Sequence, residues 1–366
     1  MHKRSVSVCQ AEQTKEEKQT NMFPMEEINF AINYTESDDL TIDASPAIGD
    51  KDTLLIIMDC LVNVFVLLLN ISLAVLILCH SKIRQQLFYW RVLNLCLSDL
   101  IVGVLVLPFG ISYTHNYAWL HGHVLCQTYV ILDVTHFGFS SLVITTMCAD
   151  RFLSKILELY PDKLQIIKFV QLFLFIMPWL FTLCVFLPLL LSSVKTMGVV
   201  FRHTCGFILH DDMLVPTAVV AYLIPNLLLI LTTVIMLIIY KVKRPVWYRL
   251  DEPEAPGSHI TPHLRSSTIA TLIVSCITML FWFPYLVNMF IMVTCRSHRC
   301  FPGLEVFKAT LILCTLTSLF TPCLWLSDDE IRTAAKQSVR RIRAFCLKPL
   351  VVREQQYNEH INEEDL

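Results

Sequence analysis

The stretch CQTYVILDVTHFGFSSLVITTMCADRF, residues 126–152, decides how the rest of this chain is organised. It is mostly apolar and long enough to cross a bilayer, yet it carries Asp133 in its outer third and Asp150 beside Arg151 at its end. A charge within a membrane span is costly unless it faces a cavity or a partner, so each acid predicts a functional site. Two acids in one span require a specific explanation.

The overall composition indicates a polytopic membrane protein. The 366 residues are 55% hydrophobic and only 16% charged, and the mean hydropathy is +0.57, which is too apolar for an ordinary soluble domain. Most cysteines lie within apolar runs, where they are expected to be small buried hydrophobic residues. The net charge of −2 says little about partners, and we expect no nucleic acid among them.

Seven apolar runs have the roughly 20 residues needed to cross a hydrocarbon core of about 30 Å. We therefore predict an all-α, seven-transmembrane helix bundle over residues 53–327, with spans at 53–80, 88–113, 123–155, 165–191, 213–241, 266–294 and 303–326. Short cytoplasmic loops concentrate Lys and Arg, which predicts an outside N-terminus and an inside C-terminus. The basic residues on the predicted inner side are Lys82, Arg84, Arg91, Lys155, Lys163, Lys168, Lys241, Lys243, Arg244, Arg249 and Arg265.

The two ends of the chain differ in character. Residues 1–52 are polar and acidic and are predicted to form a disordered extracellular tail, in which Asn33 heads a glycosylation triplet. Residues 328–346 are predicted to form an amphipathic helix whose basic residues suit an anionic inner leaflet. Cys346 is a palmitoylation candidate, and residues 347–366 are predicted to be a disordered cytoplasmic tail.

Every predicted span carries at least one landmark residue. They are Asn70; Asp99 and Pro108; Cys126, Asp133, Ser140 and Asp150-Arg151-Phe152; Trp179 and Pro188; Pro225; Trp282 and Pro284; and Thr321-Pro322. This ordered set resembles the rhodopsin-like, class A family of G-protein-coupled receptors over roughly residues 53–346. The resemblance implies a plasma-membrane receptor, not an enzyme, that passes the signal of an extracellular ligand to a heterotrimeric G protein.

The second and third spans look most like the biogenic-amine branch of that family, in which Asp133 would bind the amine. The implied ligand-binding residues are Asp133, Phe137, Thr217, Trp282, Tyr285 and Thr315. Asp133 lies about 10 Å into the bundle from Cys126, and no Lys or Arg occurs at comparable depth, so the ligand is expected to supply the cation. A small amine is the first prediction. The alternatives are a cationic peptide, or a structural Asp133 hydrogen-bonded to Thr315 or Tyr285.

Departures from the amine branch narrow the choice of ligand. Thr217, Ala218 and Ala221 replace the serines that would bind a catechol, which disfavours a catecholamine. A retinal-binding opsin is rejected because position 315 is threonine, and the motifs HExxH and GxSxG of hydrolytic enzymes are absent from the sequence. No metal or cofactor is expected apart from a sodium ion, discussed next.

The resemblance also implies a disulfide between Cys126 and Cys205, in an oxidising compartment. A second bridge is suggested between Cys295 and Cys300. Asp99, Ser140 and Ser318 resemble the sodium pocket of the family, in which hard oxygen ligands surround the ion. The alternative is a protonated Asp99 hydrogen-bonded to Asn70.

The predicted switch consists of Asp150, Arg151, Pro322 and Trp325. Asp150-Arg151-Phe152 resembles the Asp-Arg-Tyr motif of the family, in which the acid holds the arginine until activation. Thr321-Pro322-Cys323-Leu324-Trp325 lacks the asparagine and the tyrosine of Asn-Pro-x-x-Tyr, and Leu264 offers no acid to latch Arg151. These changes predict basal signalling or poor coupling, and they keep a non-signalling decoy receptor as an alternative.

Overall fold

The computed structural model describes residues 50–116, 119–159, 164–193, 205, 211–242, 262–294 and 304–343. The chain divides into two units, 1–53 and 54–366, and residues 50–53 are the described part of the first unit. Within the described ranges all regular structure is helical. Apart from residues 50–52, the predicted terminal tails lie outside these ranges, so their boundaries stay predictions.

Each of the seven predicted spans is a helix or an unbroken series of helical segments. The first, third and sixth are the single helices α3 (Asp50–Cys79), α7 (Gly122–Leu159) and α13 (Pro262–Thr294). The second is α5 (Leu87–Ile101), η1 (Val102–Val106) and α6 (Leu107–Asn116); the fourth is α8 (Leu164–Phe181), η3 (Thr182–Phe186) and α9 (Leu187–Ser193). The fifth is α10 (Asp211–Ala218), η4 (Val219–Leu223) and α11 (Ile224–Val242); the seventh is α14 (Leu304–Leu324) with η6 (Trp325–Ser327).

Length and composition bear out the membrane prediction. Among the described residues, six helices are long and apolar enough to cross a membrane, and a seventh, shorter apolar helix covers Ile312–Ser327. Large apolar side chains such as Leu54, Phe169, Leu280 and Phe290 are exposed on the bundle surface, where lipid is the expected solvent. The seven-helix bundle is therefore confirmed.

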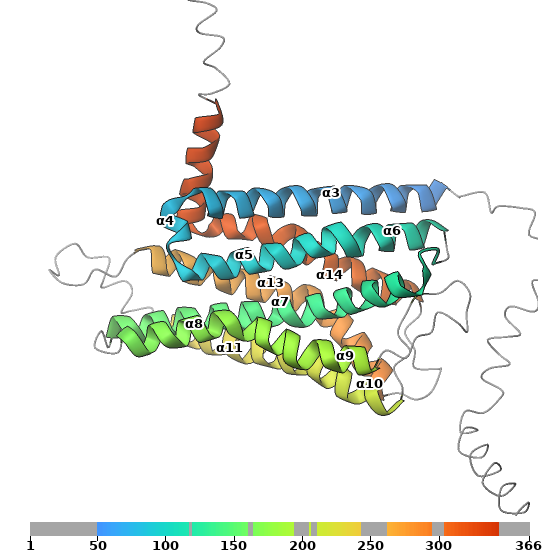
Figure 1. The fold of residues 1–366 in the computed structure, drawn as a ribbon. Helices are drawn as coiled ribbons and strands as arrows, with labels where there is room; N and C mark the ends of the chain where they lie inside the picture. Colours follow the sequence, from blue (N-terminus) through green and yellow to red (C-terminus); the bar gives the residue numbers. More distant parts are fainter. Residues whose placement is uncertain are drawn as a thin grey trace, which may run out of the picture. The chain divides into compact units, whose positions relative to one another are not determined.

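Helix α7 is the central element of the bundle. In the apolar stretch of α7 that would cross the membrane, 72% of residues are buried, whereas only 22% are buried in the corresponding stretches of α3 and α8. Figure 1 shows α7 lying between helices of both halves of the chain, and three core clusters follow one another along it. Residues on all sides of α7 therefore meet other helices, which explains why this span can carry several polar residues.

Three spans contain a π-helical turn two residues before a proline. The turns η1, η3 and η4 end at Val106, Phe186 and Leu223, and the prolines are Pro108, Pro188 and Pro225. A proline inside a helix lacks the N–H donor, and its ring collides with the carbonyl four residues earlier, so a widened turn relieves the collision. By contrast, Pro284 and Pro322 lie within continuous α-helix.

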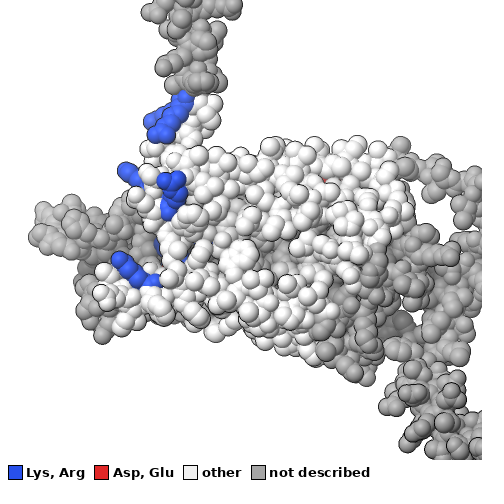
Figure 2. Space-filling view, in the orientation of Figure 1, with Lys and Arg blue, Asp and Glu red and all other residues white. Residues whose placement is uncertain are grey.

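The two ends of the bundle are chemically different. At one end Cys126, at the start of α7, is joined by the predicted disulfide to Cys205; we call this the disulfide end. Lys and Arg gather at the opposite end, as Figure 2 shows, and we call it the basic end. The short helix α4 (Ser81–Arg84) lies there with two of these basic residues, Lys82 and Arg84.

A further helix over residues 329–343 follows the seventh span at the basic end and runs across the direction of the spans in Figure 1. Asp328 caps it, because its Oδ1 accepts hydrogen bonds from the backbone N–H of Glu330 at 2.9 Å and of Ile331 at 3.1 Å. The Tyr89 hydroxyl donates to the same oxygen at 3.0 Å. Burial of Asp328 outweighs these bonds and raises the pKa of its carboxyl group.

Candidate functional site

Asp133 lies on α7 near the disulfide end and faces aromatic neighbours. Its carboxylate lies within electrostatic range of the phenols of Tyr129, Tyr222 and Tyr285. Within the described residues it makes no hydrogen bond and no ion pair, so the predicted structural bonds to Thr315 or Tyr285 are not observed. An acid held in the bundle without a cationic neighbour among the described residues is a candidate functional site.

About one turn along α7 from Asp133, aromatic side chains pack against one another. The rings of Phe137 and Tyr285 stack with their centroids 4.8 Å apart, and the Phe137 and Trp282 centroids are 4.7 Å apart. Phe137, Trp282 and Tyr285 are all buried. The hydroxyl oxygens of Tyr222 and Tyr285 lie 3.5 Å from one another, and this contact joins the fifth and sixth spans.

The structure places the two predicted threonines, Thr217 and Thr315, on the fifth and seventh spans. Thr217 is buried on α10 and Thr315 is half-buried on α14, and no contact between either residue and Asp133 is found in the part of the chain that the structure describes. From α14 it is Cys314 that joins the aromatic core and interacts electrostatically with Asp133. Cys314 thus lies close to Asp133 on α14, and the ligand-binding roles of Thr217 and Thr315 stay predictions.

Three residues near Asp133 were not predicted from the sequence. Tyr129 and His136 lie four residues before and three residues after Asp133, which places all three on one face of α7. Tyr222 lies in η4, and the widened turn there changes the face on which it projects. The helical spacing could have identified Tyr129 and His136, whereas Tyr222 depends on the π-helical turn.

Deeper in the bundle, Asp99 is bonded to a hydroxyl and lies near a histidine. Ser318 Oγ donates to Asp99 Oδ1 at 2.7 Å, and His136 Nε2 lies 3.7 Å from the same oxygen. The other carboxylate oxygen, Oδ2, has no hydrogen-bond partner among the described residues. Asn70 donates to the Ser318 carbonyl at 3.0 Å instead of to Asp99, so the predicted Asp99–Asn70 bond is not formed.

His136 stands among the residues predicted to hold sodium. Its Nδ1 is hydrogen-bonded to Ser98 Oγ at 2.9 Å and lies 3.5 Å from Ser140 Oγ. The Ser140 hydroxyl therefore faces the imidazole, while Asp99 and Ser318 face one another. The oxygens of Asp99 and Ser318 are ligands of the kind that a small hard cation prefers, and the imidazole lies near both Asp99 and Ser140.

At the basic end, Asp150 is bound by two arginines. Its Oδ2 lies 2.5 Å from Arg151, and its Oδ1 lies 2.9 Å from Arg91 on α5. Arg151 also donates to Ser267 Oγ on α13 at 2.8 Å, and its guanidinium carbon lies 3.7 Å from the centroid of the Phe88 ring. Ser267 and Phe88 thus hold Arg151 in place of the acid that position 264 lacks.

Arg91 lies at the basic end, as predicted, but it is not a loop residue. It is buried within α5 and paired with Asp150. Trp325 is likewise buried, and its ring packs edge-on against Phe88 with 5.9 Å between centroids. Pro322 lies one turn earlier inside α14.

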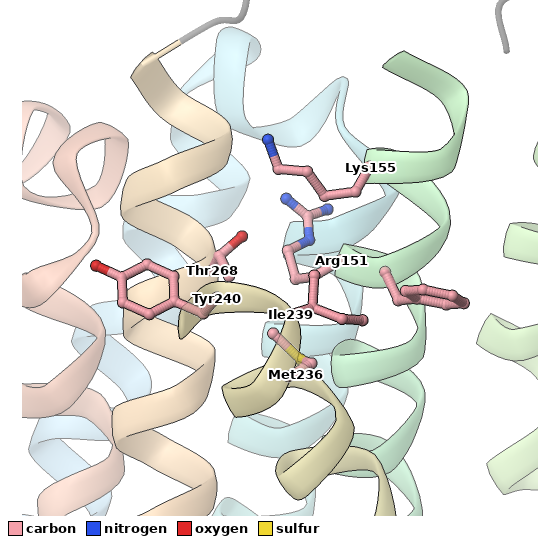
Figure 3. Close-up of a pocket in the computed structure, with 7 residues that line it drawn as sticks. Arg151, Lys155, Met236, Ile239, Tyr240 and Thr268 are labelled. Atoms are coloured by element: carbon pink, nitrogen blue, oxygen red, sulfur yellow. The ribbon is translucent and has the colours of Figure 1, made fainter. Parts of the chain in front are cut away.

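A small cavity opens beside Arg151 at the basic end. It is lined by Arg151, Phe152, Lys155, Met236, Ile239, Tyr240 and Thr268, from α7, α11 and α13. Figure 3 shows the side chains of Arg151 and Lys155 extending from α7 in the same direction. A surface with two cations and an apolar wall suits an acidic or amphipathic segment of a partner.

The remaining predicted residues lie outside the described ranges. They are Asn33, Cys295, Cys300 and Cys346. In the part of the chain that is described, no cluster of three or more His, Cys, Asp or Glu side chains could hold a metal ion.

Comparison with known proteins gives consistent matches. The sequence pattern of the family described as 7 transmembrane receptor (rhodopsin family) matches residues 69–325. C-C chemokine receptor type 8 of Macaca mulatta is 34% identical over 37% of this chain and 38% of that receptor. Histamine H2 receptor of Rattus norvegicus is 26% identical over 53% of this chain and 54% of that receptor. Prokineticin receptor 2 of Homo sapiens is 23% identical over 56% of this chain and 55% of that receptor. The matched part of the chain therefore spans about half the length of these three relatives or less.

Proposed function

The chain belongs to the rhodopsin family of seven-transmembrane receptors, the class A G-protein-coupled receptors, and from this premise we propose that it responds to an extracellular ligand that carries a cationic amine. The ligand enters from the disulfide end and binds Asp133 above Phe137 and Trp282. The signal leaves at the basic end, where a heterotrimeric G protein binds beside Arg151. Receptors of this family are not enzymes, and no reaction is assigned to this site.

The observation that carries this proposal is the environment of Asp133. Within the described residues its carboxylate meets phenols but no Lys, Arg or His side chain bonds it. Aromatic faces and phenol oxygens attract an ammonium group without neutralising the acid beforehand. A hydrogen bond between charged groups contributes about 1.5–3 kcal/mol net, so Asp133 favours a cationic ligand over a neutral one of the same shape.

The test is G-protein activation in cells that express the wild type, Asp133→Asn and Asp59→Asn at matched surface levels. The probes are a panel of aryl-alkylamines and a panel of short basic peptides. Removing one partner of a buried charge pair costs about 2–5 kcal/mol, so the potency of an active amine should fall about 30-fold or more in Asp133→Asn. Asp59 is the matched control, because it is a half-exposed acid on α3 outside the pocket.

The possible outcomes separate the hypotheses. An amine that activates the wild type and Asp59→Asn but not Asp133→Asn supports the proposal. An agonist that acts equally well on Asp133→Asn shows that the ligand does not depend on this carboxylate. If no probe changes signalling, and the wild type signals no more than Arg151→Ala, the decoy alternative replaces the proposed function.

A cationic peptide is the second candidate ligand. The relatives include a histamine receptor, but also a chemokine receptor and a prokineticin receptor. A basic group of a peptide can bind Asp133 by the same chemistry. Activation by basic peptides alone, with the same loss in Asp133→Asn, favours this candidate over a small amine.

The orientation follows from the same proposal. We place the basic end in the cytoplasm, since short cytoplasmic loops concentrate Lys and Arg, and we place the receptor in the plasma membrane with its N-terminus outside. The helix over 329–343 exposes Val339 and Ile342 beside Arg340, Arg341 and Arg343, which suits the anionic inner leaflet. Glycosylation of Asn33, palmitoylation of Cys346, a bridge between Cys295 and Cys300 and a sodium ion at Asp99 stay predictions.

A further inference from the structure

The Asp150 carboxylate is shared between two guanidinium groups that come from different helices. Arg151 is its neighbour on α7, and Arg91 approaches from α5 at 2.9 Å. The side chains of Arg91 and Asp150 are 1% and 2% exposed, and that of Arg151 is 9% exposed. One negative charge therefore faces two positive charges in a nearly dry part of the bundle.

Arg91 is fixed by its surroundings. Besides Asp150 it donates a hydrogen bond to the backbone carbonyl of Gln171 on α8, at 2.5 Å. Asp150 is the acid that binds it in the described part of the chain. Arg91 thus ties α5, α7 and α8 together, and no other described residue can neutralise it if Asp150 is lost.

Arg151 has a different set of neighbours. Its guanidinium contacts the Ser267 hydroxyl on α13 and the face of Phe88 in addition to Asp150. It also lines the cavity at the basic end, where Figure 3 shows it beside Lys155. Of the two arginines, Arg151 is therefore the one that can exchange partners.

We propose that Arg91 is a positioning residue of the switch. It neutralises Asp150, so that Arg151 can move away without leaving the buried carboxylate unpaired. Breaking a buried ion pair is strongly unfavourable when one charge is left uncompensated. With Arg91 in place, the carboxylate keeps a partner whichever way Arg151 points. This inference rests on the proposed function, because it assumes that Arg151 moves when the receptor activates.

The proposal predicts the direction of a mutational effect. In Arg91→Gln, Asp150 and Arg151 still neutralise one another in the resting arrangement, so the protein should fold. Release of Arg151 would then leave the Asp150 carboxylate without a cationic partner. We expect basal and agonist-stimulated nucleotide exchange to fall about fivefold or more, the usual lower range of coupling between two sites. In Asp150→Asn no carboxylate remains to be left unpaired when Arg151 moves, so adding Arg91→Gln should raise the thermal midpoint by removing an unpaired cation, but should change exchange per folded receptor by less than about twofold.

A second readout keeps this inference separate from G-protein coupling. A trifluoromethyl-phenylalanine at Leu264, at the start of α13, reports by fluorine NMR on the populations of the resting and active arrangements in purified receptor. Arg91→Gln should shift the populations toward the resting state, and the double variant should match Asp150→Asn. If the wild type activates no G protein, the proposed function fails while the spectra still test the role of Arg91.

The control is Arg84→Gln, because Arg84 is an exposed arginine at the same end whose guanidinium donates to the Leu78 carbonyl. It should leave both readouts at wild-type values, and Arg91→Lys should restore part of the loss because it keeps the charge. The proposal is overturned if Arg91→Gln leaves exchange and spectra unchanged or raises activity. It is also overturned if the effects of Arg91→Gln and Asp150→Asn simply add.

Discussion

Three aspartates in the interior of the bundle meet three different kinds of neighbour. Asp150 faces two guanidinium groups, Asp99 faces a hydroxyl and an imidazole, and Asp133 faces phenols. Because a buried carboxylate is stabilised by whatever neutralises it, these neighbours indicate different roles. Asp150 is compensated within the protein, Asp133 is the acid that we propose to bind an external cation, and Asp99 lies between these cases.

At the scale of single residues we predict that His136 limits sodium binding at Asp99. In His136→Ser a hydroxyl oxygen replaces the competing imidazole, so sodium affinity should rise. The thermal midpoint of the purified variant in sodium chloride, compared with choline chloride, should increase by about 2 °C or more beyond the wild-type shift, since about 1 kcal/mol of added binding energy has that effect. The measurement is a thermal melt followed by intrinsic fluorescence.

The double variant His136→Ser/Asp99→Asn is the control for this prediction. It lacks the carboxylate that would bind the ion, so its midpoint should be the same in both salts. An equal sodium response in the wild type and His136→Ser would show that the imidazole does not compete with the ion.

The sequence indicated Asp99, Asp133, Asp150 and Arg151 because charged residues within apolar runs are conspicuous. It indicated the contact of Asp150 with Arg151 and the grouping of Asp99 with Ser318, but not the part of Arg91 or of His136. Arg91 is near the end of a span, where a buried arginine and a loop arginine look alike in sequence, and its role depends on the approach of α5 to α7. The partners of His136 likewise come from α5 and α7 together, and that contact cannot be read from either run alone.

At the scale of elements, the packing of α7 against its neighbours depends on a residue without a side chain. A Cβ atom at Gly138 would lie 2.0 Å from Cε2 of Phe186 and 3.1 Å from the carbonyl oxygen of Ala221. Phe186 and Ala221 belong to η3 and η4, and both are fully buried. The two π-helical turns therefore approach α7 closely at this position, next to Phe137.

We predict that Gly138→Ala lowers stability and ligand affinity together. Phe186 cannot move without displacing its neighbours, and overpacking a core costs about 1–3 kcal/mol. The thermal midpoint of the detergent-solubilised receptor should fall, and binding of a radiolabelled agonist should weaken, because η4 also carries Tyr222.

Gly110→Ala is the matched control, since a Cβ there would lie 3.6 Å from the Tyr129 hydroxyl, an ordinary contact. Alanine is also the better helix former by about 1 kcal/mol, so this variant should be neutral or slightly stabilising. Equal midpoints for the two variants would show that the close approach at Gly138 is readily relieved.

The element boundaries follow closely from hydropathy, because a span needs a minimum apolar length and ends where polar residues begin. The prolines of the second, fourth and fifth spans each follow a π-helical turn. They did not indicate which distortion occurs, since Pro225 follows a π-helical turn while Pro284 lies within continuous α-helix. The difference depends on how neighbouring helices receive the displaced backbone, and this is a tertiary property.

At the scale of the whole molecule, α7 connects the two ends that a receptor must couple. Asp133 and Arg151 lie on this one helix, and α13 meets it at both levels, through Tyr285 near the pocket and Ser267 at the basic end. A ligand changes the arrangement at the basic end only to the extent that it binds the two arrangements with different affinity. Contacts present in only one arrangement therefore set how far the equilibrium can move.

Trp325 makes buried contacts in the arrangement described here, in which Arg151 is bonded to Asp150. Its ring is fully buried against Phe88, and Phe88 in turn covers the Arg151 guanidinium. Replacing this ring by leucine removes buried contacts on the order of 2 kcal/mol. If about half of that energy belongs to the resting arrangement alone, Trp325→Leu should raise basal nucleotide exchange about fivefold while lowering the thermal midpoint.

Phe320→Leu is the matched control, because Phe320 is an aromatic residue on α14 that is 41% exposed on the bundle surface. It should leave basal exchange unchanged, since its environment does not include Arg151. If Trp325→Leu lowers the thermal midpoint but leaves basal exchange at the wild-type level, the tryptophan stabilises both arrangements equally. In that case it acts as a packing residue, and the resting state is held by Asp150, Ser267 and Phe88 alone.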